Sequence, residues 1–590
     1  MGIRRFIYLP LTAMTALPAV PALAQSAAPT REEIDRKPVT PLPPTTGQRV
    51  TVEGDVERAP CPLADTSFSG VTLTLSGAEF SNLKGIPADI LRPAYEAYIG
   101  KTIPIATVCE IRDAAATILR RRGYLAAVQV PPQKIDNGVV RFDVLLAKIV
   151  DFQVRGNAGK AEGIITGYLS AIKNQEVFNI LEAERYLLLA RDLPGYDVRL
   201  TLRPAGTVPG EVIGEVQVVY TPVEAEANIQ NYGSKNTGRF GGLAQVHFNG
   251  LLGTGDRTSL GFFSTADFEE QQVAQFGEEL RIGHNGLTIA ANAAYAWTHP
   301  DIGPGLNLRS RTFVASLEAR YPLVRRQSRN LIVSGGLDWV DQRVRFSGLP
   351  LTKDNIRVGY VRLDYDQIDS ESIASARGYS ASEPLWRFGG SIELRQGLGI
   401  FNNSDDCGPA QALCALPGVV PISRTAADTT AFVARAQSYF EFRPVPIFAI
   451  SVSPRVQYAP HALLSYEEFS AGNFTVGRGY DPGTITGDSG IAIASEFRLG
   501  SLVPKSNKDT AVQGYAFFDT AWVWNKDPGT PNDPQKLYSV GGGVRAAIGD
   551  RFNLDVGGAV PLKRAGLQSK RGDVRFLINL TMRLLPWNRR

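Results

Sequence analysis

One stretch of the chain carries the residue pattern of a catalytic nucleophile. Gly487-Asp-Ser-Gly490 matches the sequence around the reactive serine of trypsin-like proteases. Such a serine needs a histidine base within hydrogen-bond reach and a carboxylate that orients this base. The chain has four histidines, and none lies in a protease-like context: His247, His284, His299 and His461. We therefore interpret the match as coincidental and expect no catalytic residues.

The four cysteines offer either metal ligation or disulfide chemistry. No Cys-x-x-Cys pair occurs and no histidine is near a cysteine in sequence, which disfavours a zinc site. Cys407 and Cys414 lie in a stretch rich in Gly, Pro and Asp, and we expect a disulfide that staples one loop. Cys61 and Cys109 are far apart in sequence but fall within one predicted module. A second disulfide is expected there.

Nothing else in the sequence indicates a cofactor or a nucleic-acid partner. A formal net charge of +4 in 590 residues is too balanced to favour nucleic acid or an acidic substrate. A G-x-x-x-x-G-K-[ST] loop is absent, so no nucleotide is expected. We predict neither a bound metal nor any other cofactor.

The first residues indicate export. Arg4 and Arg5 precede an apolar run over residues 6–20, and Ala22-Leu-Ala24 supplies a small-x-small cleavage pattern. Residues 1–24 are thus predicted to be a signal peptide cleaved before Gln25. No later apolar stretch reaches the roughly 18 residues that a membrane-spanning helix needs. If the exported chain spans a membrane, it must do so as a closed barrel.

Residues 25–60 are predicted to form a short helix and a linker. Thr30-Arg-Glu-Glu33 matches a capping box, which favours a helix from Arg31 to Lys37. Several prolines from Pro38 onward then end this helix and give an extended segment. A disordered leader is the alternative that composition leaves open.

Two units with the same order of elements follow, in residues 61–147 and 148–222. The first is predicted to contain strand 71–75, helices 90–99 and 105–122, and strands 126–130 and 139–146. The second is predicted to contain strand 149–154, helices 161–172 and 181–193, and strands 197–202 and 213–220. Strand-helix-helix-strand-strand occurring twice indicates a repeated α+β module.

In residues 223–590 the helical period disappears, and short segments of alternating hydrophobicity follow one another. Many segments reach about 9 to 11 residues, the length that crosses a bilayer at a tilt. One face stays free of charge, as a lipid-facing side requires, since Arg or Lys at mid-membrane costs roughly 2 to 4 kcal/mol. Several tryptophans lie near segment ends, as in aromatic girdles: Trp297, Trp339, Trp522 and Trp524. We predict a transmembrane antiparallel β-barrel of about sixteen strands, an even number that allows closure.

This layout resembles that of the two-partner secretion transporters, or TpsB family, in which two POTRA modules precede a sixteen-strand barrel. The most specific match is Phe474-Thr-Val-Gly-Arg478-Gly479-Tyr480. It resembles the family's Val-Arg-Gly-aromatic pattern on the sixth extracellular loop, which folds back into the lumen. Here Val476 and Arg478 are separated by Gly477, a departure from the pattern.

A second match is Phe517-Phe-Asp519-Thr-Ala521, similar to the superfamily's Phe-x-Asp-x-Gly signature in the thirteenth strand. Alternation aims Asp519 at the lumen, because lipid would not accept its charge. The resemblance implies that Arg478 pairs with Asp519 and locks the loop inside the barrel. Without the resemblance, Arg478 would be one loop cation among many. Glu496 is an alternative partner.

The modules also carry short runs that resemble haemolysin-type transporters. These are Cys109-Glu-Ile-Arg, Arg122-Gly-Tyr124, Pro132-Gln133, Asn137-Gly-Val-Val-Arg141 and Arg191-Asp-Leu-Pro-Gly195. The resemblance implies an outer-membrane translocator, not an enzyme, whose periplasmic POTRA modules bind a secreted, TpsA-like exoprotein. Outer-membrane lipid is the other expected partner. Strand edges after Tyr124 and in 197–202 are the predicted docking edges. A barrel-assembly factor and a passive porin are the alternatives, but a porin would leave residues 61–222 without a role.

Overall fold

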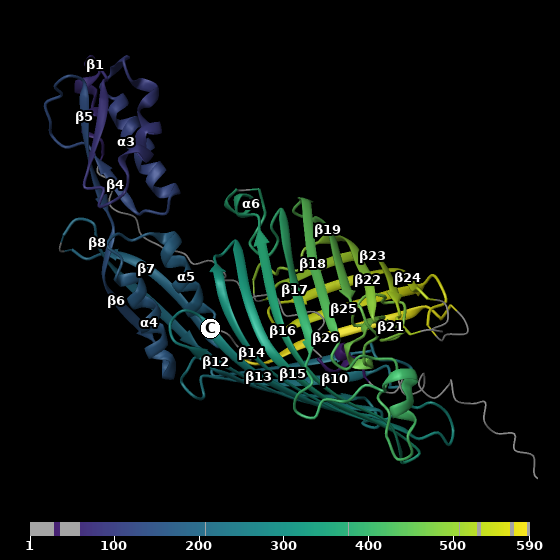
Figure 1. The fold of residues 1–590 in the computed structure, drawn as a ribbon. Helices are drawn as coiled ribbons and strands as arrows, with labels where there is room; N and C mark the ends of the chain where they lie inside the picture. Colours follow the sequence, from purple (N-terminus) through teal and green to yellow (C-terminus); the bar gives the residue numbers. More distant parts are fainter. Residues whose placement is uncertain are drawn as a thin grey trace, which may run out of the picture.

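The computed structural model describes residues 29–35, 60–206, 208–375, 377–506, 508–527, 533–566 and 571–586. The predicted signal peptide and the proline-rich linker lie outside these residues. Two small modules follow one another beside one end of a large barrel (Figure 1). None of the helices in the described part of the chain is both long and apolar enough to cross a membrane.

Module one is a three-stranded sheet covered by a single long helix. Its strands, in the order β2-β5-β4, are β2 (Gly77–Ser81), β5 (Val139–Leu146) and β4 (Ala126–Gln129), and α3 spans Thr107–Arg121. The predicted strand at 71–75 is β1 (Thr72–Thr74), which pairs only with β3 (Thr102–Pro104), outside this sheet. Prediction missed β2, whose large apolar residue, Phe80, stacks on Phe142 with ring centroids 5.0 Å apart.

The predicted helix at 90–99 is wrong. Two 3₁₀ segments, Ala88–Ala94 and Glu96–Tyr98, occupy this region instead. Pro93 lies inside the first segment and has no N–H to donate, so a continuous α-helix cannot form across it. Leu91 and Ala94 are still buried, which explains why the apolar spacing resembled a helix. Shorter 3₁₀ turns span Pro62–Ala64 and Thr66–Phe68.

Module two has the predicted order of elements throughout. It contains β6 (Lys148–Gly156), α4 (Glu162–Lys173), α5 (Ile180–Arg191), β7 (Tyr196–Pro204) and β8 (Glu211–Tyr220). The sheet order is β6-β8-β7, so β7 has one unpaired edge. Both helices cover the same sheet and bury Tyr168, Leu187 and Val216 in one core. The apolar period therefore identified these elements because no proline interrupts them.

Sixteen antiparallel strands form the closed barrel, which confirms the predicted fold class. Eight of them precede the middle of the barrel: β9 (Val223–Gln230), β10 (Gly241–Asn249), β11 (Arg257–Thr265), β12 (Gln271–Ile282), β13 (Leu287–Thr298), β14 (Leu308–Arg325), β15 (Arg329–Phe346) and β16 (Leu349–Ile368). The other eight are β17 (Trp386–Gly397), β18 (Phe432–Val445), β19 (Phe448–Tyr458), β22 (Ser489–Gly500), β23 (Thr510–Trp524), β24 (Gln535–Ile548), β25 (Phe552–Pro561) and β26 (Arg575–Leu585). Pairing of β26 with β9 closes the barrel.

Alternation separates an apolar outer face from a charged lumen. On β14, Leu317 is 54% exposed while its neighbour Glu318 is buried inside. We call the connections at the end opposite to the modules the outer loops, numbered one to eight in chain order. Outer loops five, six and seven span 398–431, 459–488 and 525–534. A short helix, α6 (Ser370–Ala374), lies in the connection after β16, at the module end.

Module two packs against the module end of the barrel rather than hanging from it. The Arg325 guanidinium, at the end of β14, donates to both carboxylate oxygens of Asp192 at 2.7 Å. Arg185 of α5 donates to the carbonyl of Asn285 in the connection after β12 at 3.2 Å. Together with the chain crossover at 220–223, these contacts at the ends of β12 and β14 hold module two against the barrel.

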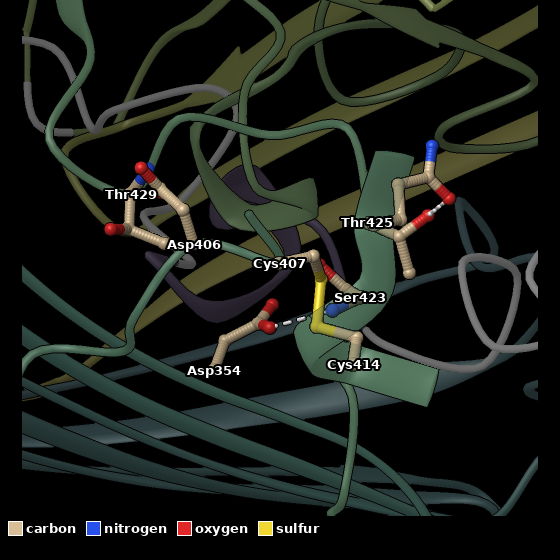
Figure 2. The surroundings of a disulfide bond; sticks show 8 residues. Asp354, Asp406, Cys407, Cys414, Ser423, Thr425 and Thr429 are labelled. Carbon is tan, nitrogen blue, oxygen red and sulfur yellow. Dashed lines mark hydrogen bonds between the residues drawn. A yellow bond between two sulfur atoms is a disulfide. The ribbon is translucent and has the colours of Figure 1, made fainter. Parts of the chain in front are cut away.

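Both predicted disulfides are present in the structure. Cys61 bonds Cys109 across 48 residues in module one, and Cys407 bonds Cys414 across seven residues in outer loop five. Figure 2 shows the second bond beside Asp354, which accepts a hydrogen bond from the backbone of Ser423 at 2.7 Å. The first disulfide ties the N-terminal 3₁₀ turns of module one to α3.

Replacing Cys61 and Cys109 with Ser should destabilise module one by about 4 kcal/mol, because the long closed loop restricts the unfolded chain. Hydrogen exchange of the β4 and β5 amides in the full-length protein measures this change. The matched control replaces Cys407 and Cys414 with Ser, which should leave β4 and β5 exchange unaltered. Equal exchange in both variants would contradict the expectation.

Candidate functional site

Outer loop six turns back into the barrel instead of covering it. Two short strands inside the lumen, β20 (Phe469–Ala471) and β21 (Ile485–Gly487), pair with each other and form the base of the loop. Val476 and Tyr480, near the tip, are buried against the inner wall. The tyrosine hydroxyl donates to the Lys563 carbonyl at 2.7 Å. The loop is therefore a packed part of the barrel interior.

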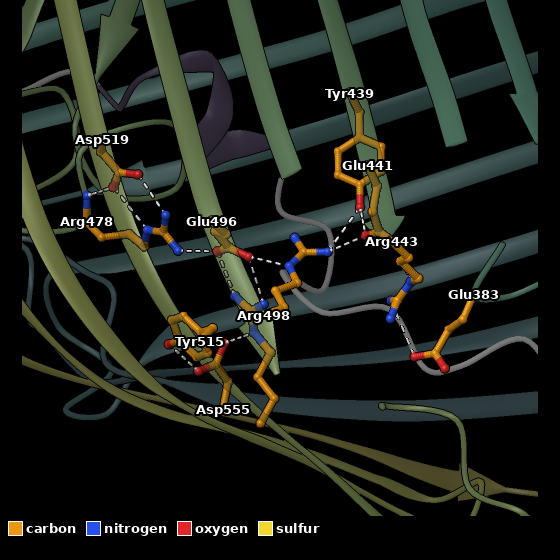
Figure 3. A network of polar contacts seen from close by, with 11 residues as sticks. Glu383, Tyr439, Glu441, Arg443, Arg478, Glu496, Arg498, Tyr515, Asp519 and Asp555 are labelled. Carbon is orange, nitrogen blue, oxygen red and sulfur yellow. Dashed lines mark hydrogen bonds and ion pairs between the residues drawn. The ribbon is translucent and has the colours of Figure 1, made fainter. Parts of the chain in front are cut away.

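The loop tip is attached to β23 through Asp519. Arg478 donates from Nη2 to Oδ1 at 2.7 Å and from Nε to Oδ2 at 3.0 Å (Figure 3). The same Oδ2 accepts the backbone N–H of Arg478 at 2.9 Å and that of Gly477 at 3.3 Å. Asp519 is 0% exposed, so the loop provides the hydrogen bonds of a buried charge.

The inserted Gly477 takes part in this contact. Its φ is +118°, a conformation that residues with a side chain rarely adopt, and it aims two consecutive N–H groups at one carboxylate oxygen. A Cβ at this position would also lie 2.8 Å from Leu537. The departure from the family pattern is thus accommodated without displacing Arg478.

Glu496, on the neighbouring strand β22, is a second anchor of the same arginine. Its carboxylate accepts from Arg478 at 2.5 Å, from Arg498 at 2.7 Å and from Arg545 at 3.0 Å. The Arg478 guanidinium also lies 3.6 Å from the ring centroid of Phe517. The structure therefore brings Arg478 to both carboxylates rather than to one of the two alternatives.

Small residues let the loop approach the wall closely. Ala521 is fully buried under the loop. At Gly479 a Cβ would lie 2.9 Å from both the Ser539 side chain and the Pro561 nitrogen. Larger side chains at either position would push the tip away from β23 and β24.

Helix α2 (Arg31–Ile34) also lies inside the barrel lumen (Figure 1). Its predicted capping box is present, with the Thr30 hydroxyl accepting from Glu33 N at 3.3 Å and the Glu33 carboxylate accepting from Thr30 N at 2.9 Å. Glu32 accepts from Arg455 of β19 and from Ser470 of loop six, both at 2.9 Å. Lys37, the predicted end of the helix, lies outside the described residues.

A cavity of about 480 Å³ remains beside α2, lined by charged residues of the helix and of the wall. Burial alone would raise the pKa of Glu32, but Arg455 lowers it overall, so the helix keeps its negative charge beside that arginine. Ile34 is 1% exposed and packs among buried apolar residues of the barrel wall and of outer loop five. Helix α2 thus connects the wall, loop five and loop six.

Comparison with known proteins identifies the family. The sequence model of the haemolysin secretion/activation protein family ShlB/FhaC/HecB matches residues 215–546, more than half of the chain. The chain belongs to the haemolysin secretion/activation protein family. A POTRA domain model of the ShlB type matches residues 73–146, so module one is a POTRA domain.

Individual relatives are distant. The heme/hemopexin transporter protein HuxB of Haemophilus influenzae (strain 86-028NP) is 24% identical over 191 residues, 31% of this chain and 33% of that protein. The chain therefore aligns with about a third of the length of this curated relative. The outer membrane transporter CdiB-2 of Burkholderia pseudomallei (strain 1026b) is 23% identical over 97% of this chain and 98% of its own.

Among solved structures, CdiB from Escherichia coli has the same fold. Its TM-score is 0.68 at 16% identity, over 97% of this chain and 100% of that chain. The protein is thus an outer-membrane barrel of the haemolysin secretion/activation family with periplasmic POTRA modules. In this orientation the outer loops are extracellular.

Loop six has further anchors that the sequence did not reveal. Its acidic residues are bonded by arginines of the wall and of outer loop five, all distant in sequence. Glu467 contacts Arg395 at 2.8 Å and Arg435 at 2.9 Å. Asp481 contacts Arg575 at 2.8 Å. Spacing along the chain carries no signal for such pairs, because each joins segments brought together only by barrel closure.

Outer loop five closes over loop six through Arg424. This arginine is 6% exposed and contacts Glu468 at 3.0 Å, Asp488 at 2.5 Å and Asp527 of outer loop seven at 2.5 Å. Burial lowers the pKa of its guanidinium, but the three carboxylates raise it well above the ordinary value. Loop five is therefore joined to outer loops six and seven through one charge.

The protease-like stretch has a structural role here. Asp488 accepts from Arg424 and from the Leu463 backbone N–H at 2.7 Å. The Ser489 hydroxyl accepts from the Ala459 backbone at 3.1 Å. The group of three or more His, Cys, Asp or Glu side chains that a metal ion would need does not occur among the described residues.

Replacing Asp519 with Ala should loosen the loop tip. The variant removes the shared acceptor of two backbone N–H groups and leaves Arg478 with Glu496 alone. A buried pair that loses one partner is destabilised by about 3 to 5 kcal/mol, and hydration of the lumen reduces this value. We expect amides 474–480 to exchange hydrogen at least about tenfold faster in the folded barrel.

The matched control is Asp364→Ala, since Asp364 lines the lumen on β16 and bonds Arg362 at 2.8 Å rather than a residue of loop six. Exchange at 474–480 should equal that of the unchanged protein in this control. An Asp519→Ala protein with the same exchange would contradict the anchoring role.

Proposed function

We propose that the protein exports a partner exoprotein across the outer membrane through the barrel lumen, without catalytic chemistry. The observation that carries the proposal is the content of the lumen. Two separate segments, α2 and loop six, lie in it, and among the described residues both are joined to the wall by ion pairs and hydrogen bonds rather than by disulfides. Helix α2 and loop six can therefore leave the lumen while the sixteen wall strands remain paired.

The periplasmic modules supply sites for an extended polypeptide. β4 of module one and β7 of module two are edge strands of their sheets, as expected for the predicted docking edges. An unpaired edge can accept an additional strand through main-chain hydrogen bonds. Because module two is fixed to the barrel by Arg325 and Asp192, a chain bound to β7 is held close to the lumen entrance.

The names of the relatives agree with export. HuxB is a heme/hemopexin transporter protein and CdiB-2 an outer membrane transporter. A passive porin is disfavoured because its lumen must stay open, whereas here charged segments close it.

Deletion of residues 61–222 should abolish secretion of the partner while the barrel still inserts. The edge strands are lost, but every wall strand is retained. The measurement compares partner protein in the medium with heat-modifiable migration of the membrane-inserted barrel. Secretion that survives the deletion, with the barrel inserted, would contradict the docking role of the modules.

Replacing Arg455 with Ala should open the lumen to ions more often. The variant removes the cation that bonds Glu32 of α2, a partly buried pair worth about 1 kcal/mol. We expect the open probability, measured as ion conductance across a planar bilayer, to rise about fivefold. Arg362→Ala is the control, because Arg362 lines the same cavity but bonds Asp364 instead. Equal conductance in the two variants would contradict the plug role of α2.

A further inference from the structure

The outward face of the barrel carries a compact group of cations near its extracellular end. We call it the basic cluster; it consists of Arg309, Arg311, Arg343, Arg345 and Lys353. On β15, Val340, Gln342 and Val344 are buried toward the lumen, so the alternate positions 343 and 345 point outward. The four arginines are exposed and the lysine is half-buried. These cations therefore face the membrane side of the wall, not the transport pathway.

Strand register places the cations directly opposite one another. Arg311 pairs with Arg343, Arg343 pairs with Lys353, and Arg309 pairs with Arg345. Like charges in directly opposed positions destabilise a sheet. Three adjacent strands thus hold a repulsive arrangement, which an anionic ligand would relieve.

No carboxylate within the described residues neutralises the basic cluster. The acidic residue next to it on the same face is Asp341, which is already bonded to Arg357 at 2.8 Å and to the indole N–H of Trp339 at 3.1 Å. Arg357 itself lies 3.5 Å from the Trp339 ring centroid. This neighbouring arginine shows how an outward cation is satisfied within the protein, and the cluster lacks such partners.

The basic cluster lies at the border between an aromatic belt and the extracellular side. Arg311 is in register with Trp297. One row closer to the periplasm, the outward-facing residues of the same two strands are Tyr295 and Phe313. Further toward the periplasm the outward face is aliphatic, with Leu317 54% and Leu337 50% exposed. Aromatic rings mark the interface of a membrane-spanning barrel with its lipid headgroups. The cations therefore lie at headgroup level in the outer leaflet.

Strand length agrees with this position. β14, β15 and β16 contain 18, 18 and 20 residues and lie side by side (Figure 1). Since about 9 to 11 residues cross the bilayer, these strands continue beyond the hydrocarbon region. Neighbouring strands are about 4.8 Å apart, so three strands present cations over a span of about 10 Å. That span suits one phosphorylated headgroup.

We propose that the basic cluster binds the phosphate groups of a lipid in the outer leaflet of the outer membrane. Arginine guanidiniums bind phosphate oxygens through two parallel N–H donors, and the long side chains reach the headgroup while their stems stay against the barrel. A soluble acidic partner fits less well, because an approaching protein would have to displace the lipid beside the aromatic belt. The bound lipid fixes the depth of this wall in the membrane.

The test uses the full-length protein in uncharged detergent and diphosphoryl lipid A as the probe. Each cation near an anionic lipid surface contributes about a fivefold factor, so Arg311→Gln with Arg343→Gln should weaken binding roughly thirtyfold. Arg326→Gln with Arg329→Gln is the matched control, because it removes two exposed cations at the periplasmic end of the same wall. The control variant should bind diphosphoryl lipid A as tightly as the unchanged protein does. Lipid A without phosphates should bind weakly to all three proteins.

Three results would overturn the proposal. The first is equal lipid binding by the cluster variant and the unchanged protein. The second is inorganic phosphate that competes at the same concentration as the lipid, which would indicate a site for a free anion. The third is a cluster variant that keeps lipid binding but secretes less of the exported partner, which would indicate a protein-docking face. Since the variant removes like-charge repulsion, the barrel is expected to fold.

Discussion

The carboxylate of Asp519 carries its charge inside the barrel wall only while loop six surrounds it. Two backbone N–H groups and two guanidinium nitrogens of the loop donate to it, and no part of it is exposed. An unpartnered charge in such a place is costly, so withdrawal of the loop requires water to enter the lumen at the same time. The closed state of the lumen therefore depends on the exclusion of water from the Asp519 carboxylate. A hydrated polypeptide in the lumen would favour release.

The remaining contacts of the lumen follow the same principle of reversible charge pairing. Arg395, Arg424 and Arg575 each bond acidic residues of loop six, and Arg455 bonds α2. The disulfide of outer loop five joins two residues of that loop and does not link it to loop six. Closure is built from many polar contacts, which can exchange for water, rather than from an apolar seal.

The sequence predicted features that depend on local pattern, and the structure added those that depend on closure. Alternation identified the wall strands because the part of each strand that crosses the hydrocarbon has a lipid side that excludes charge. The 3₁₀ segments around Pro93 imitated a helix through their buried Leu91 and Ala94. The contact of Arg478 with Asp519 came from a resemblance to a family motif. Partners such as Arg575 and Asp481 could not be predicted, because they are distant in sequence and meet only in the closed barrel. The role of Gly477 became evident only from its positive φ.

Arg478 and Asp519 are expected to act as one unit that governs opening of the lumen. A double-mutant cycle on partner secretion tests this most directly, with Arg478→Ala, Asp519→Ala and both changes together in barrels that assemble normally. We expect each single variant to alter secretion and the double variant to show less than the combined defect of the two, because the contact between Arg478 and Asp519 can be lost only once. Single variants that secrete like the unchanged protein, or a double variant whose defect is the product of the two single defects, would contradict the account.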